Sequence, residues 1–472
     1  MIDSSYIEVY KNRDVSFKFR GRSYEFALSH GLFSSAGIDA GSALLLKVFS
    51  NYVDDMGYEA SQPQITILDA GCGTGVLGIC AAGALTDILQ ERPPAGKPSV
   101  YVRAQDRDDL ARLFTEHNAK RNNINPEIFS AHAEPIFAGP DKSGQKKWDI
   151  ILSNIPAKAG EPVLEDFVRR SAALLKPAGR VFLVAVNPLA DFFRSRIGEN
   201  AFLVSEQSNA GYTVFAYTSV YEGAPGITQA KTAQTDDEQS PIIFDDNFLQ
   251  RYPFYIRNRS EFEMTGISYK MDTVHGAADF DSPNGAIQTA AILTKKIMAK
   301  TGLSFNDRPN ILIHDDAGQG HFAVWLKKFL GSAAGGKAGG IGGYTVGDIN
   351  WTLSGRNVLG RAAARAALQS GSSAAARWAV QNGSCDSLIT RYSLIAFFPE
   401  NVPQSKPESL WWDYLSRLCM EGAYVIAASG SMEMERFDKK KPPGFSRLGD
   451  LKRKGFRAAV YLRTNAAGSA NV

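Results

Sequence analysis

Four residues at alternate positions, Asp69, Gly71, Gly73 and Gly75, form the segment of this chain best suited to bind an anionic group. They follow an apolar run at residues 65–68, and the pattern predicts a buried strand, a glycine turn and the start of a helix. Gly71 and Gly73 remove side chains where a ligand would approach the backbone, while Gly75 would let the next helix pack close to the strand. The amides at the helix start can bind an anion. The spacing differs from the dinucleotide fingerprint, whose third glycine falls three residues after the second.

Two further predicted strands end on polar residues. Asp106 closes the predicted strand 100–106, where an acid can accept both ribose hydroxyls of a nucleoside, and a solvated strand-end acid is the alternative. The predicted strand 149–153 leads into Asn154 and Pro156. Ligands of open α/β sheets bind at the carboxyl ends of strands, so this loop would face the reacting group. Asn154 could hold an amine by hydrogen bonds, although the spacing fits equally well an Asn that caps a turn before proline.

The composition sets broad limits on the class of protein. A chain of 472 residues with 44% hydrophobic residues predicts two or three globular domains. The net charge of +3 neither requires nor excludes a nucleic-acid partner. The four cysteines form no Cys-x-x-Cys pair and no zinc-binding spacing, so we predict no metal site. A polar N-terminus and the lack of a long apolar run predict a cytoplasmic protein with no membrane partner.

Strands and helices alternate between residues 65 and 221, which predicts a parallel sheet with helical crossovers. Strands are expected at residues 65–69, 100–106, 128–132, 149–153, 179–186 and 213–220, and in the second half at residues 391–398, 422–428 and 457–463. An amphipathic hairpin is expected at residues 15–26 and a helix at 41–53. The segment 222–241 has no apolar periodicity and is interpreted as a linker. We therefore predict a first domain at residues 1–221 and a second at residues 242–472.

The second domain repeats the first at nearly constant offsets of 242 to 245 positions. Residues 309–320 match the glycine-turn segment, with His314 in place of Asp69 and Asp316 in place of Gly71. Later matches pair Asp348 with Asp106 and Phe397 with Asn154. An acid in place of the first glycine adds bulk and negative charge against a ligand carboxylate. The second domain is therefore predicted to be a degenerate copy.

The order of these segments resembles the methyltransferase small-domain family of class I S-adenosylmethionine (SAM) methyltransferases. The segments are residues 31–34 (Gly-Leu-Phe-Ser), 37–46 (Gly-Ile-Asp-Ala-Gly-Ser-Ala-Leu-Leu-Leu), the glycine turn and 149–156 (Asp-Ile-Ile-Leu-Ser-Asn-Ile-Pro). The family includes ribosomal RNA guanine-N2 methyltransferases, several of which carry two tandem copies with the inactive one first. The resemblance implies an α/β fold of two tandem Rossmann-like domains. Each would hold a mostly parallel, seven-stranded sheet with an antiparallel last strand.

The resemblance also implies a role for each site residue. The methionine part of SAM would lie among Asp69, Gly71, Gly73 and Gly75, its ribose at Asp106 and its adenine at His132. A segment that contains Asp39, Gly41 and Ser42 would close over the cofactor. Asn154 and Pro156, which match an Asn-Pro-Pro-aromatic motif, would be the catalytic residues beside it. Ile155 replaces the first proline of that motif, and Ala157 replaces the aromatic residue that stacks on a flipped base. The form here is similar to family members with Asn-Pro-Pro-Ile-Arg-Ala-Gly.

Two basic clusters suit contact with structured RNA, or are solvated faces. One comprises Lys11, Arg13, Lys18, Arg20 and Arg22, and the other comprises Lys439–Lys441, Arg447, Lys452–Lys454, Arg457 and Arg463. Our interpretation is a SAM-dependent methyltransferase that acts on a nucleobase amine, most simply in ribosomal RNA, with no DNA specifically implied. A methyltransferase of proteins or small molecules, and a non-catalytic assembly factor that binds SAM and RNA, are the alternatives. The oligomeric state is left open.

Overall fold

The structure is a computed structural model that describes residues 4–55, 64–91, 99–139, 147–220, 242–278, 281–301, 309–333, 348–369, 378–380 and 390–464. The chain forms two compact units, Met1–Asp245 and Asp246–Val472. The predicted linker 222–241 lies outside the described residues. Ile242, where the second domain was expected to begin, pairs instead with Ala138 of the first unit.

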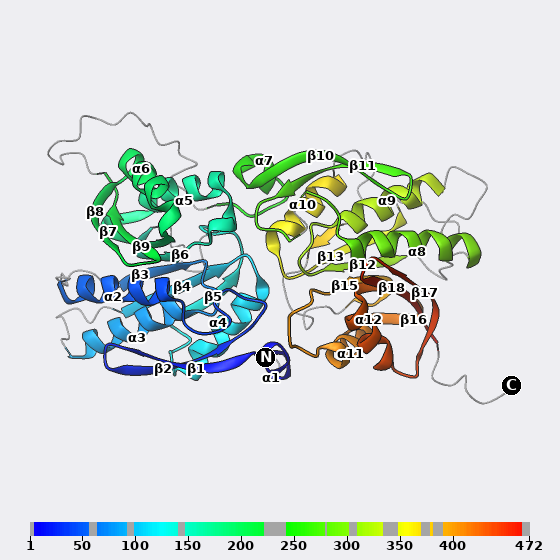
Figure 1. The fold of residues 1–472 in the computed structure, drawn as a ribbon, viewed down its shortest axis with the longest axis horizontal. Helices are drawn as coiled ribbons and strands as arrows, with labels where there is room; N and C mark the ends of the chain where they lie inside the picture. The colour runs from blue at the N-terminus through cyan, green and yellow to red at the C-terminus, as the bar shows by residue number, and fades with distance from the viewer. Residues whose placement is uncertain are drawn as a thin grey trace. The chain divides into compact units, whose positions relative to one another are not determined.

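The first unit begins with a hairpin and continues as alternating strands and helices (Figure 1). Its elements are α1 (Ser4–Tyr10), β1 (Arg13–Phe19), β2 (Arg22–Leu28), α2 (Ala40–Asp55), β3 (Gln64–Ala70), α3 (Val76–Glu91), β4 (Ser99–Asp106), α4 (Asp109–Arg121), β5 (Phe129–Ala133), β6 (Trp148–Asn154), α5 (Glu161–Ala173), β7 (Leu175–Val186), α6 (Ala190–Asn200), β8 (Phe202–Ser208) and β9 (Tyr212–Thr218).

Seven strands of this unit form one sheet in the order β5-β4-β3-β6-β7-β9-β8. All neighbours pair in parallel except at β9, which runs antiparallel to both β7 and β8. The chain reverses its direction of winding between β3 and β6, so the carboxyl ends of these strands border the expected ligand crevice. The predicted sheet with an antiparallel last strand is therefore confirmed.

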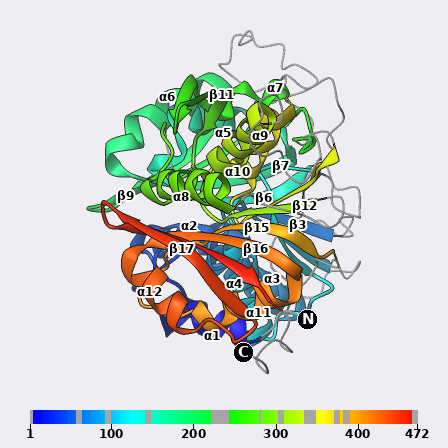
Figure 2. The ribbon, with the colours of Figure 1, turned by 90° about the vertical axis from the view of Figure 1, so that its right-hand side faces the viewer.

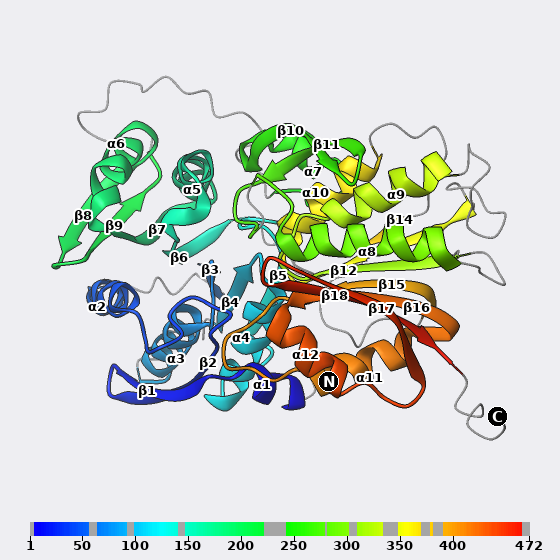
Figure 3. The ribbon, with the colours of Figure 1, turned by 45° about the vertical axis from the view of Figure 1, so that its right-hand side comes forward.

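The second unit repeats this plan. Its elements are α7 (Phe248–Arg251), β10 (Ile256–Met264), β11 (Ile267–Val274), α8 (Gly285–Thr301), β12 (Asn310–Asp315), α9 (His321–Ala333), β13 (Asn350–Ser354), α10 (Val358–Gln369), β14 (Trp378–Val380), β15 (Tyr392–Phe398), α11 (Glu408–Leu418), β16 (Cys419–Gly430), α12 (Ser431–Lys439), β17 (Phe445–Arg453) and β18 (Phe456–Arg463). Its sheet has the equivalent order β14-β13-β12-β15-β16-β18-β17. Helices α8, α9 and α10 cover one face of this sheet, and α11 and α12 cover the other (Figures 2 and 3).

The strand registers correct two of the predicted matches between the copies. Asp348 precedes β13, so it does not close that strand as Asp106 closes β4, and Arg356 follows the strand instead. Phe397 pairs with His314, just as Leu152 pairs with Asp69, so Phe397 corresponds to Leu152 and not to Asn154. The offset shifts between these strands because the copies differ in loop length.

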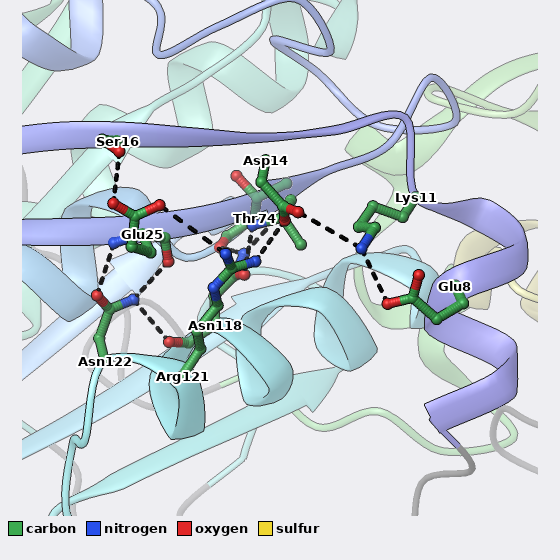
Figure 4. Close-up of polar contacts among 10 residues, drawn as sticks. Glu8, Lys11, Asp14, Ser16, Glu25, Thr74, Asn118, Arg121 and Asn122 are labelled. Carbon is green, nitrogen blue, oxygen red and sulfur yellow. Dashed lines mark hydrogen bonds and ion pairs between the residues drawn. The ribbon is translucent and has the colours of Figure 1, made fainter.

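The N-terminal hairpin is fixed to the glycine turn by buried amides of α4 (Figure 4). Asn118 donates from Nδ2 to the carbonyl oxygens of Ala27 and Thr74, at 3.1 and 2.9 Å, and accepts from the Ala27 amide at 2.8 Å. Asn122 bonds the backbone of Glu25 through both its amide oxygen and its amide nitrogen. Buried amides with satisfied partners specify one arrangement of these elements. The hairpin therefore helps to hold the loop that forms the candidate site.

Candidate cofactor and catalytic site

The glycine turn follows β3 and combines an open side with a packed side. Gly71, Gly73 and Gly75 have φ angles of +82°, +55° and +83°, a conformation that favours glycine. A Cβ atom on Gly71 or Gly73 would meet nothing within 4 Å, whereas one on Gly75 would lie 2.9 Å from Cγ2 of Thr115. The first two glycines thus leave room for a ligand. The third permits close packing, although against α4 and not only against the expected helix α3.

Asp69 ends β3 as a fully buried carboxylate. Its Oδ2 accepts the amide of Gly78 at 2.8 Å, while its buried Oδ1 has no hydrogen-bond partner among the described residues. Burial raises the pKa of Asp69 to about 7; the Gly78 amide opposes this shift and the charge of Asp106 adds to it. A buried acceptor without a partner requires an explanation. The ammonium group of a methionine moiety over Gly71 and Gly73 would supply that partner, so these residues fit the predicted cofactor.

Asp106 lies against the glycine turn at the end of the neighbouring strand. Its two carboxylate oxygens accept the amides of Gly73 and Asp108, at 3.1 and 3.0 Å. Each oxygen keeps a further lone pair, so the carboxylate can still accept hydroxyl groups. Burial raises the pKa of Asp106, and the nearby charge of Arg107 opposes that shift. His132 lies on β5 opposite Gln105, one residue from Asp106, and its Nε2 is 3.0 Å from Oγ of Ser130.

Asn154 ends β6 with both hydrogens of its amide group used. Its Nδ2 lies 2.9 Å from Oδ2 of Asp39 and 2.9 Å from Oγ of Ser42. Both partners accept these bonds, and this fixes which side of the amide is oxygen. Oδ1 of Asn154 has no partner among the described residues, so it is left to accept an N–H group from a ligand. Asn154 is only partly buried, which keeps that oxygen within reach.

The loop after Asn154 departs from the expected aromatic motif. Ile155 is buried and Pro156 is half-buried, while Ala157 is exposed at the start of a single 3-10 turn, Ala157–Ala159. A methyl group at this position cannot stack on a ring. The exposed side chain at this position therefore offers no surface on which a base could stack.

Tyr212, which the sequence analysis did not identify, joins this group from the start of β9. Its hydroxyl donates to Oδ1 of Asp39 at 2.8 Å, and this bond, together with partial burial, raises the pKa of Tyr212. The ring lies over the start of α2, where a Cβ on Gly41 would be 2.7 Å from its Cδ1 atom. The predicted last strand began one residue later, which placed Tyr212 in a loop. In the structure Tyr212 pairs with Val186 at the carboxyl end of β7, a register that no local pattern in the sequence indicates.

Asp39 is the residue that these contacts share. Its Oδ2 accepts the Ser42 amide at 3.1 Å as the N-cap of α2, and the same oxygen accepts from Asn154. Its Oδ1 accepts from Tyr212. The structure therefore brings the predicted residues Asp39, Gly41, Ser42 and Asn154 together. Asp39 and Ser42 contact Asn154 directly, so in this structure they orient its amide.

The corresponding edge of the second unit is filled by charged side chains. Asp316, in place of Gly71, accepts from Nε2 of His314 at 2.8 Å and from the amide of Glu400 at 3.2 Å. Glu400 in turn pairs with Arg356 at 2.9 Å. Burial alone would raise the pKa of Asp316, but the charge and hydrogen bond of His314 hold it below its usual range. Asp316 is buried and engaged, so a hydrogen-bonded carboxylate stands where the first unit has Gly71.

The first unit resembles one protein family and several individual proteins. Residues 23–215 match the family model for the methyltransferase small domain. The uncharacterised protein YbxB of Bacillus subtilis is 28% identical over 170 residues, which cover 36% of this chain and 72% of that protein. A ribosomal protein L11 methyltransferase of Teredinibacter turnerae is 38% identical over 121 residues, which cover 26% of this chain and only 33% of that enzyme.

One solved structure resembles the chain over nearly its whole length. This is a T. thermophilus 16S rRNA N2 G1207 methyltransferase in complex with AdoMet and guanosine, with a TM-score of 0.55 and 12% identity. The match covers 97% of this chain and 100% of that one. At this identity the likeness shows a shared fold of two tandem domains. Separately, none of the described helices is long and apolar enough to cross a membrane.

Replacing Asp69 tests the unpaired carboxylate. Because burial raises its pKa from 3.8 to about 7, the ligand-free protein loses stability as the pH rises between these values, where the unfolded chain ionises first. Asp69→Asn keeps an acceptor for Gly78 and removes the titration. We expect the variant to gain stability over wild type from about pH 4 to about pH 7, by at most about 4 kcal/mol, and to bind the cofactor more weakly. Calorimetry across this range checks it, and a pH-independent difference would contradict the assignment.

Tyr212→Phe tests whether the hydroxyl positions Asn154 through Asp39. We expect kcat to fall about tenfold while the affinity for the cofactor is unchanged, because only the orientation of Asn154 is loosened. Tyr217→Phe is the matched control, since it removes a 2.7 Å hydroxyl contact with Ser171 from the same strand. The control should lose stability and keep its kcat. Equal losses of kcat in the two variants would rule out a positioning role.

The filled edge of the second unit predicts a binding stoichiometry. We expect titration calorimetry with SAM to give one site per chain, because Asp316 occupies the space that Gly71 leaves open. Gly71→Asp introduces the same side chain into the first unit and should abolish binding altogether. A second site, or binding that survives in the variant, would show that the second unit holds the cofactor.

Proposed function

Because residues 23–215 belong to the methyltransferase small domain family, whose enzymes use SAM, we propose that this chain methylates an amine nitrogen of a nucleobase in ribosomal RNA. The observation that carries the proposal is the amide of Asn154, whose two hydrogens are held by Asp39 and Ser42. Its oxygen is left to accept a hydrogen from a substrate amine. An N–H donor is therefore the substrate group that this geometry fits.

The proposed cofactor position uses the open side of the glycine turn. Asp69, Gly71 and Gly73 would hold the methionine moiety, Asp106 the ribose hydroxyls, and His132 would lie near the adenine. When bound, SAM supplies a methyl group on a sulfonium, which is already a strong electrophile. The protein therefore has little acid–base chemistry to perform, and holding the amine in line supplies most of the rate.

Asn154 orients the amine in the proposed mechanism. Its Oδ1 accepts one N–H hydrogen, and this turns the nitrogen lone pair toward the methyl carbon. The bond to Asp39 prevents the amide from flipping, since a flipped amide would place its oxygen against a carboxylate that can only accept. Pro156 stiffens the following backbone. The loop can then keep the substrate in one orientation.

The comparisons support a ribosomal target without deciding between its two components. A protein with the same tandem fold acts on ribosomal RNA, and the similar enzyme of Teredinibacter turnerae acts on a ribosomal protein. The exposed Ala157 favours the second candidate, an amine of a ribosomal protein, because no side chain stacks on a base there. The hydrogen-bonded Asn154 site disfavours an assembly factor without catalysis, which would have no use for a fixed amide oxygen.

Three of the five basic residues of the N-terminal hairpin cluster form ion pairs, whereas Arg13 and Lys18 are exposed and have none among the described residues. Lys11 lies between Glu8 and Asp14 (Figure 4). Arg20 pairs with Asp54, and Arg22 lies 3.7 Å from Asp87. These ion pairs partly neutralise three of the five charges, so Arg13 and Lys18 are the hairpin residues that keep a charge available to RNA.

Asn154→Ala is expected to reduce methyl transfer by about two orders of magnitude, because the amine loses its orienting acceptor. The affinity for SAM should change by less than about twofold, since the glycine turn is untouched. Asn200→Ala, at the end of α6, is a control that removes an amide bonded only to the backbone of its own helix. Parallel losses of SAM affinity and transfer in Asn154→Ala would place this residue in cofactor binding.

The substrate class is tested with tritiated SAM and ribosomes from cells that lack this gene. Label in nuclease-sensitive material is the expected result. Label only in protease-sensitive material would reject the RNA proposal in favour of the ribosomal protein. No label with wild-type protein, and none above the Asn154→Ala background, would reject both.

A further inference from the structure

The two copies differ sharply in charge at one place, the helix and hairpin that complete each sheet. In the second unit this subdomain, residues 431–463, carries ten basic and four acidic side chains. The equivalent residues 187–218 of the first unit carry two basic and three acidic ones. The whole chain has a net charge of only +3, so the excess is concentrated in this subdomain of the second unit.

The excess is most accessible at the turn between β17 and β18. Lys452, Arg453 and Lys454 are all exposed, and neither Arg453 nor Lys454 has an ion pair with any residue that the structure describes. The equivalent turn of the first unit follows Ser208 and contains Asn209, Ala210 and Gly211, which are uncharged. The basic side chains are therefore a property of the second copy and not of the shared fold.

Several other cations of the subdomain form ion pairs. Arg447 pairs with Asp438 at 2.7 Å, and Arg457 pairs with Asp450 at 2.9 Å. Glu435 pairs with Lys439 at 2.8 Å, and its pKa is lowered by Lys439 and, more weakly, by Arg457 and Lys452. These pairs account for the acids along the hairpin and α12. Arg453 and Lys454 of the hairpin tip, and Lys440 after α12, are left without an ion pair among the residues that the structure describes.

This turn lies at the ligand-binding edge of the second sheet. Gly430, the last residue of β16, pairs with Phe456, and the amide of Ser431 donates to the carbonyl oxygen of Gly455 at 2.9 Å. The turn therefore lies beyond the carboxyl end of a parallel strand. The start of α12 is beside it, where Met432 is 71% exposed. A run of exposed cations suits contact with the phosphates of a nucleic-acid backbone.

We propose that Lys452, Arg453 and Lys454 bind the phosphate backbone of the substrate RNA. The inference rests on the proposed function, because it takes RNA as the partner. The second unit, whose cofactor position is filled by Asp316, then serves as the RNA-holding part of the enzyme. Contacts from these three cations to phosphates would recognise the RNA backbone and not its base sequence.

The test is RNA binding by the full chain carrying Lys452→Gln, Arg453→Gln and Lys454→Gln together. The matched control carries Lys295→Gln, Lys296→Gln and Lys300→Gln, three exposed lysines near the far end of α8, with the same change in charge. Binding of purified ribosomal RNA is measured over a range of salt concentrations. For single strands each phosphate contact contributes about 0.7 to the steepness of log affinity against log salt concentration. Because three cations are removed, this slope should be shallower by about 2 in the turn variant. Its affinity at about 0.1 M salt should fall at least about tenfold, and the control should stay within about twofold of wild type.

The outcomes separate this inference from the proposed function. If wild type methylates RNA and the turn variant binds RNA with unchanged affinity and slope, the surface is wrong and the function stands. If the wild type methylates only a ribosomal protein, while the turn variant still loses RNA binding, the proposed RNA-binding surface stands and the proposed substrate is wrong. Two results would overturn the surface as a site for RNA. One is an equal loss of RNA affinity in the turn variant and the α8 control. The other is that polyglutamate competes for the protein as well as RNA does.

Discussion

The candidate site depends on one carboxylate, that of Asp39. It caps α2, accepts a hydrogen from Asn154 at the end of β6 and accepts another from Tyr212 at the start of β9. These elements are far apart in the sequence, so a single side chain sets the relative position of the N-terminal segment and the sheet edge. The amide of Asn154 thereby becomes part of the same hydrogen-bonded unit as the start of the first long helix.

Much of the fold could be predicted from the sequence, because buried parallel strands have continuous apolar runs. The six predicted strands of the first unit and the equivalent strands β12, β15, β16 and β18 are found near their expected positions. The edge strands β8 and β17 were missed for a physical reason: most of their residues are exposed, so neither shows apolar alternation. Strand assignments from apolar patterning are therefore least reliable at the edges of a sheet.

The site was predictable in its residue types but not in its connections. The glycine turn, Asp106 and Asn154 have local signatures. The resemblance assigned Asp39, Gly41 and Ser42 to a segment over the cofactor, whereas the contacts that the structure shows are those of Asp39 and Ser42 with the Asn154 amide. Tyr212 has no local signature, because its importance comes from a partner 173 positions away. The copy alignment failed at Asp348 and Phe397 because constant spacing does not detect a change in loop length.

The duplicated turn separates two demands that glycines meet together in the first unit. Gly75 and Gly320 share nearly the same backbone angle, with φ of +83° and +81°, and a Cβ on either would collide with the helix after the next strand, at Thr115 or Ala364. The second copy kept this glycine and replaced the one at position 71 by an acid. The glycine that both units share is the one that packing requires, whereas the one that differs, at position 71, is the one beside which the first unit leaves open space.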